Sequence, residues 1–154
     1  MTTKITGANV NTLSLGVVNG VIQTTLAAAL EKVTISATAA TGTINYELST
    51  QSILYYTSNA SANWTVNIRG NSGTTLNSMM ATGQSVTMTF LVTQGSPAYY
   101  NSSVTIDGAS VTPKWLGGSA PSAGNINGVD VYTYTVIKTG SSAYTVFASQ
   151  SRYA

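Results

Sequence analysis

The chain has 154 residues, the length of one ordinary domain. Charged residues make up only 6% of it, against roughly a quarter in a typical soluble domain, and His and Cys are both absent. This composition excludes histidine-dependent and thiol chemistry, disulfides and the usual zinc sites. The net charge of +2 is too weak to predict a nucleic-acid groove or a polybasic membrane surface.

Residues 1–32 differ from the rest of the chain. Their apolar residues are interrupted by Asn19, Gly20 and Gln23, which break the clean apolar run of a signal peptide. No stretch reaches the roughly 18 apolar residues that a membrane helix needs. We therefore interpret residues 1–32 as an N-terminal arm for attachment or oligomerisation, which packs on the domain or on a neighbouring subunit. The apolar residues expected to make the contact are Leu13, Leu15, Val17, Val18, Val21 and Ile22.

From residue 33 onward, apolar residues alternate with Thr and Ser, which is the period-two pattern of β-strands. The cleanest predicted strand covers residues 86–92, a longer one covers residues 129–138, and a final one covers residues 143–149. About eight short strands with frequent turns favour an all-β fold. We predict a β-sandwich, jelly-roll-like in its connections, over residues 33–154.

Three segments interrupt the alternation. An Asp-Gly pair at 107–108 predicts a tight hairpin. Between 70 and 83, the apolar residues of the stretch 76–80 have the spacing of one helical face, so we predict a short helical crossover. Residues 115–128 are rich in Gly and predict a long surface loop, where specific contacts tend to lie.

Few residues have the chemistry of a catalytic site. A glycosidase needs two carboxylates facing each other across a cleft, but Asp107 lies in a predicted turn and Asp130 opens a strand, which are ordinary structural positions. The Ser and Thr residues have no His to activate them and no Gly-x-Ser-x-Gly turn. A dense Asp/Asn-Gly loop of the kind that binds calcium is also missing. We predict no catalytic, metal-binding or cofactor-binding residues, and no enzymatic activity.

The aromatic residues divide into two groups. Trp64 is predicted to fill the core, whereas Tyr99, Tyr100 and Trp115 lie near loop edges and are candidate contacts for a partner or a glycan. Two hypotheses follow. An assembly protein would pack its neutral, Thr-rich sheets against its own copies or a shell, with no discrete sugar pocket. A carbohydrate-binding module would bind a glycan saturably through Trp115 or through the tyrosine pairs Tyr55–Tyr56 and Tyr99–Tyr100.

Three stretches between about residue 33 and Tyr153 resemble a domain common in structural proteins of tailed phages, especially phages of marine cyanobacteria. They read QSILYYTSNASANWTVNIRGNSGTTLNSMMATGQSVTMTFLVTQGSPAYYNS, VTIDGASVTPKWLGG and GVDVYTYTVIKTGSSAYTVFASQSRY. In that family the domain occurs in virion proteins, often at the ends of tail-fibre-like or other appendage proteins, and also as short standalone chains. No enzymatic activity is associated with it. The resemblance does not extend clearly to residues 1–32.

The resemblance implies a virion structural protein. A short chain without a fibre shaft suits a capsid-surface decoration (knob or cement) protein better than a tail-fibre, neck or other appendage protein. A carbohydrate-binding module for receptor recognition is a further alternative. The expected partners are the major capsid protein or other virion proteins, sister subunits in a homo-oligomer, and a host surface glycan, with neither nucleic acid nor membrane. The expected location is the virion, on the capsid surface rather than the tail.

Overall fold

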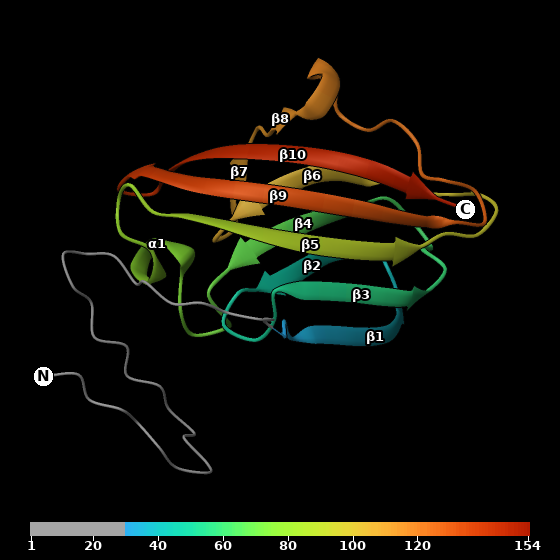
Figure 1. Ribbon diagram of the computed structural model, residues 1–154, viewed down its shortest axis with the longest axis horizontal. Helices are drawn as coiled ribbons and strands as arrows, with labels where there is room; N and C mark the ends of the chain where they lie inside the picture. Colours follow the sequence, from blue (N-terminus) through green and yellow to red (C-terminus); the bar gives the residue numbers. More distant parts are fainter. Residues whose placement is uncertain (1–29) are drawn as a thin grey trace, which may run out of the picture. The chain divides into compact units, whose positions relative to one another are not determined.

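The computed structural model describes residues 30–154, of which residues 31–154 form one compact unit. The six predicted arm contacts Leu13, Leu15, Val17, Val18, Val21 and Ile22 lie outside the described residues. The elements seen in Figure 1 are β1 (Val33–Ala39), β2 (Gly42–Glu47), β3 (Ile53–Ser58), β4 (Trp64–Arg69), α1 (Leu76–Met79), β5 (Ser85–Thr93), β6 (Asn101–Ile106), β7 (Ala109–Val111), β8 (Lys114–Trp115), the 3-10 turn η1 (Leu116–Gly118), β9 (Val129–Gly140) and β10 (Ala143–Tyr153).

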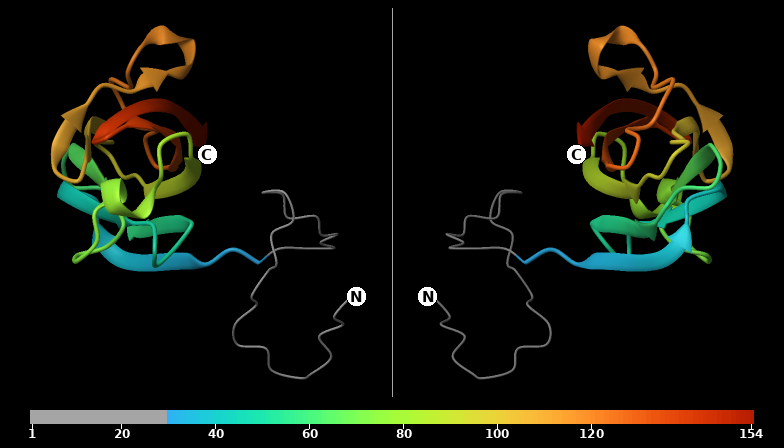
Figure 2. Two further views of the ribbon diagram at one scale, coloured as in Figure 1. Left: turned by 90° about the vertical axis from the view of Figure 1, so that its left-hand side faces the viewer. Right: turned by 90° about the vertical axis from the view of Figure 1, so that its right-hand side faces the viewer.

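The strands form two sheets, which Figure 2 shows from both ends. The large sheet has the order β1-β3-β5-β9-β10-β8, and the small sheet has the order β2-β4-β6-β7. A single apolar core contains buried residues from both sheets. The all-β sandwich that the alternation predicts is therefore confirmed.

The strand directions differ from those of the predicted jelly roll. The first six strands alternate between the two sheets, so that β1, β3 and β5 pair in parallel in one sheet and β2, β4 and β6 in the other. The later pairings of β5 with β9, β9 with β10 and β6 with β7 are antiparallel. A jelly roll is built from antiparallel strands throughout. In the first half of the domain, the pairs β1–β2, β3–β4 and β5–β6 instead each place one strand in each sheet, and the three pairs stack like successive coils of a parallel β-helix.

The core is joined across the two sheets by aromatic contacts. Trp64 of β4 meets Phe90 of β5 and Tyr132 of β9 edge to face, with ring centroids 6.1 and 5.7 Å apart. The side chain of Trp64 is 1% exposed, which confirms its predicted place in the core. The large sheet contributes every second residue of its strands to this core, and that alternation decides which side chains remain on its outward side.

The predicted hairpin joins β6 to β7 through Asp107 and Gly108, whose φ angles are 51° and 83°. Both residues have the positive φ that a type I′ turn requires. The Asp107 carboxylate also accepts hydrogen bonds from the backbone amides of Leu76 and Asn77, at 2.7 and 3.0 Å. The turn therefore holds the first residues of α1. The predicted helical crossover is confirmed as this single turn of helix.

Candidate functional site

The outward side of the large sheet has no charged residue on its five long strands. We call the outward-pointing side chains of β1, β3, β5, β9 and β10 the outer face. The charged residues that adjoin it are Lys32, which precedes β1, and Lys114, on the short edge strand β8. The residues of the outer face are Val33, Ile35, Ile53, Tyr55, Thr57, Ser85, Thr87, Thr89, Leu91, Thr93, Val129, Val131, Thr133, Thr135, Ile137, Thr145, Phe147, Ser149, Ser151 and Tyr153.

Four apolar side chains of the outer face form one line across the strands. Ile35, Tyr55, Leu91 and Val131 are successive cross-strand partners, and we call them the apolar row. Ile35 is 69% exposed and the other three are half-buried. An apolar patch of this kind in an uncharged surround is typical of a surface that a partner covers.

The outward side of the small sheet differs, because its polar side chains bond one another. Asn67 donates a hydrogen bond to Asn45 and accepts one from Thr105, both at 2.8 Å. In the next row Arg69 pairs with Glu47 at 2.6 Å, the only ion pair among residues 30–154. These groups already have partners within the sheet, so the two outward sides of the sandwich differ in what they offer to another molecule.

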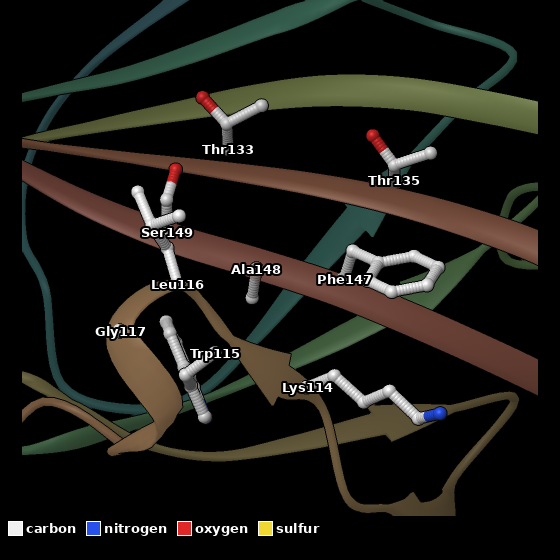
Figure 3. A pocket seen from close by; sticks show the side chains of 9 residues that line it. All are labelled: Lys114, Trp115, Leu116, Gly117, Thr133, Thr135, Phe147, Ala148 and Ser149. Carbon is white, nitrogen blue, oxygen red and sulfur yellow. The ribbon is translucent and has the colours of Figure 1, made fainter.

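A groove lies at the edge of the outer face remote from β1, where β8 and η1 stand beside β9 and β10 (Figure 3). Its volume is about 470 Å³. Gly117 has a φ of 79°, in the left-handed region that favours glycine, and this residue lets the chain turn sharply within η1. We call this the β8 groove. It is lined by Lys114, Trp115, Leu116, Gly117, Thr133, Thr135, Phe147, Ala148 and Ser149.

The β8 groove combines apolar surface with one cation. Phe147 is 46% exposed, and Leu116 on η1 is 81% exposed. The Lys114 ammonium lies 6.0 Å from the centroid of the Phe147 ring. Lys114 and Phe147 are cross-strand partners, so the sheet itself holds the cation beside the ring.

Hydroxyl groups complete the groove. Thr133 and Ser149 are cross-strand partners on β9 and β10, while Thr135 is the partner of Phe147. The hydroxyl of Thr135 is hydrogen-bonded to that of Thr87 at 2.9 Å. Within residues 30–154 the hydroxyls of Thr133 and Ser149 have no hydrogen-bond partner, so both are free to bind a polar ligand.

Only one of the three predicted aromatic contacts lies in the β8 groove. Trp115 lines it and is half-buried, with its ring 6.3 Å from that of Tyr134 on the core side. Tyr99 and Tyr100 lie in the connection between β5 and β6 and line no part of this groove. Gln94 holds the backbone of Tyr99 at both its amide and its carbonyl, at 2.9 and 2.8 Å. The predicted contacts of these three residues with a partner or glycan stay predictions.

The predicted surface loop 115–128 begins with the end of β8 and with η1, and buried polar groups hold the part that follows η1. Asp130 Oδ2 accepts hydrogen bonds from Gln94 Nε2 at 2.9 Å and from the Asn125 amide at 3.1 Å. Burial raises the pKa of Asp130, and the hydrogen bonds from Asn125 and Gln94 oppose that rise. A Cβ atom at Gly124 would lie 2.2 Å from the Tyr99 carbonyl oxygen, so this close approach requires glycine. Asp130 thus has structural partners on two segments.

The sequence did not single out Phe147 or the hydroxyls of the β8 groove as contacts. These residues come from β8, β9 and β10, and they meet only because of strand pairing that alternation does not encode. One feature of the sequence could have indicated that Phe147 points outward. A large aromatic residue stands between Val146 and Ala148, and these two smaller residues suit the inward positions of a strand.

Comparisons with known proteins assign no family to the chain. No family model, curated protein or solved structure matches it. Among residues 30–154 no helix has the length and apolar character needed to cross a membrane. The same residues contain no group of three His, Cys, Asp or Glu side chains that could hold a metal ion.

Proposed function

We propose that this chain is a structural protein of a phage virion, a decoration protein held non-covalently on the capsid surface. The resemblance of residues 33–153 to virion domains supports this function. The observation that carries the proposal is the outer face, which presents no charge over five strands and exposes an apolar row. Such a surface suits a protein whose working state is an assembly.

An uncharged face can be covered by another protein at little electrostatic cost. Removing an ion from water costs several kcal/mol unless it is paired, and the outer face has none to remove. Its apolar side chains gain roughly 25 cal/mol per Å² when they are covered. The part of the outer face on β1, β3 and β5, three strands about 4.8 Å apart and about seven residues long at 3.3 Å per residue, has an area of roughly 350 Å². A standard interface buries about 800 Å² on each partner, so this part supplies nearly half of one, and the arm and a strand added beside β1 supply the rest.

The sheet edges support the same function. β1 and β2 are edge strands of the two sheets, and no described strand pairs with their free edges. β1 contains neither a charged residue nor proline, which are the common guards against unwanted strand pairing. A partner can therefore add a strand beside β1. In this proposal the predicted arm, which precedes β1 in the chain, buries its apolar residues against the major capsid protein or sister subunits.

The test measures how much of each variant purified phage particles carry. We expect a chain lacking residues 1–24, and separately Ile35→Glu, to lower the amount of the chain per particle at least tenfold. Thr43→Glu is the matched control, because Thr43 is also exposed on an edge strand but faces outward from the small sheet. Full occupancy by the shortened chain would overturn the arm, and full occupancy by Ile35→Glu would overturn the role of the outer face. Circular dichroism verifies that each variant is folded.

A further inference from the structure

We propose that the β8 groove binds a saccharide that carries a carboxylate group. This inference goes beyond the proposed function and does not depend on it. β8 and β1 are the two opposite edges of the large sheet, as Figure 1 shows, and the apolar row ends on β9. Attachment through β1, β3 and β5 therefore leaves the groove, whose outer-face residues lie on β9 and β10, open to a second ligand.

The groove has the size of a small-ligand site and an apolar platform. Its volume of about 470 Å³ lies within the range of roughly 300–1,000 Å³ that small-molecule sites occupy. In Figure 3 the Phe147 ring projects over the groove from β10, and Leu116 approaches from η1. The C–H faces of a sugar ring can stack on the exposed Phe147 ring, as apolar groups do on aromatic faces.

The polar groups of the groove match the remaining surface of a sugar. The free hydroxyls of Thr133 and Ser149 can each donate to and accept from a sugar hydroxyl. They lie on neighbouring strands, so two adjacent sugar hydroxyls can be bound at once. An aromatic ring with hydroxyls at its side offers both kinds of contact that a sugar ring needs.

Lys114 decides the charge of the ligand. It is the only charged residue of the groove, and the one ion pair of residues 30–154 lies elsewhere, between Arg69 and Glu47. The ammonium can therefore pair with a carboxylate of the ligand. A nucleic acid is a poorer match, because binding its backbone requires several cations. An added peptide strand is also excluded along Phe147 and Ala148, since β8 already pairs with both.

The experiment is an NMR titration of the ¹⁵N-labelled full chain with trigalacturonate and, in parallel, with its fully methyl-esterified form. We expect saturable amide shifts at Lys114, Leu116 and Ser149. The acid should bind about threefold more tightly than the ester, as one exposed ion pair provides. Absence of saturable shifts at these residues, or equal affinity for acid and ester, would overturn the proposal.

Two variants and two matched controls locate the binding. Phe147→Ala should weaken binding about fivefold by removing the aromatic platform. Lys114→Gln should abolish the preference for the acid. Tyr153→Ala, at another exposed aromatic residue of β10, and Lys32→Gln, at another exposed lysine, should bind as the unaltered chain does. Unchanged binding by Phe147→Ala, or equal losses in the controls, would contradict the proposed site.

Discussion

Asp130 is fully shielded from solvent at the start of β9, and within residues 30–154 only one of its two carboxylate oxygens has hydrogen-bond donors. Oδ2 accepts hydrogen bonds from the side-chain amide of Gln94 and the backbone amide of Asn125, whereas Oδ1 has no partner among residues 30–154. Loss of solvation raises the pKa of this carboxyl group above its ordinary value of 3.8, against the opposing hydrogen bonds and the charge of Arg152. The folded state is therefore more stable when this carboxyl group is neutral, because the cost of burying the charge exceeds the gain from the hydrogen bonds.

The raised pKa of Asp130 predicts that the free energy of unfolding depends on pH. Because the pKa is raised in the folded state, the contribution of Asp130 is fully present below pH 3.8 and is lost as the pH rises through the folded-state pKa. Asp130→Asn keeps an acceptor for Gln94 and Asn125 and cannot ionise. Relative to the unaltered chain, the variant should therefore gain unfolding free energy as the pH rises from 3.5 to 7, measured by urea denaturation. A difference between the two chains that does not change with pH would contradict this account.

At the level of secondary structure, Asp107 stabilises both the β6–β7 turn and the start of α1. Its backbone adopts the positive φ of the β6–β7 hairpin, and its carboxylate holds the amides of Leu76 and Asn77 at the start of α1. Alanine at this position loses both, because it has no acceptor and disfavours positive φ. Asparagine retains an acceptor and tolerates that backbone.

We therefore expect Asp107→Ala to lower the free energy of unfolding by about 2 kcal/mol, from the lost cap and the strained backbone together. Asp107→Asn should lose less than half of that. Urea denaturation at constant pH measures both. Equal losses in the two variants would show that the charge, rather than the turn and the hydrogen bonds, holds α1.

Elements with a strong local pattern could be predicted from the sequence, and their pairing could not. The alternation at 86–92 and 129–138, the Asp-Gly hairpin and the helical crossover all appear in the structure. The parallel coils did not follow from the sequence, because a strand alternates identically whichever way its neighbour runs. β1 shows the same limit. Its alternation is real, but Val33 and Ile35 point outward, and the inward Thr34 bonds Gln51 instead.

Over the whole molecule, the few charged residues are distributed unevenly, and the outer face has none of them. On β9 and β10 the charged residues Asp130, Lys138 and Arg152 lie on the side opposite the outer face. Glu47 and Arg69 pair with each other on the small sheet. Composition could predict neutral strand surfaces, but it could not show that one sheet face is free of charge, because that depends on which side of each strand faces the core.

The candidate site was less predictable than the fold for the same reason. Trp115 was the one predicted contact that the structure places in the β8 groove, since a loop position next to glycines is visible in the sequence. Phe147 and its neighbouring hydroxyls come together only when β8, β9 and β10 pair. The apolar row likewise assembles from four strands that are separate in the chain.

At the level of function, we propose that this chain decorates the head of a phage particle. Under that proposal, immunogold labelling of intact phage particles with antibody raised against the full chain is the decisive test. We predict dense label over the capsid surface, at least tenfold above the density on the tail. Label confined to the tail, the neck or a fibre, or its absence from particles that contain every other structural protein, would contradict the claim.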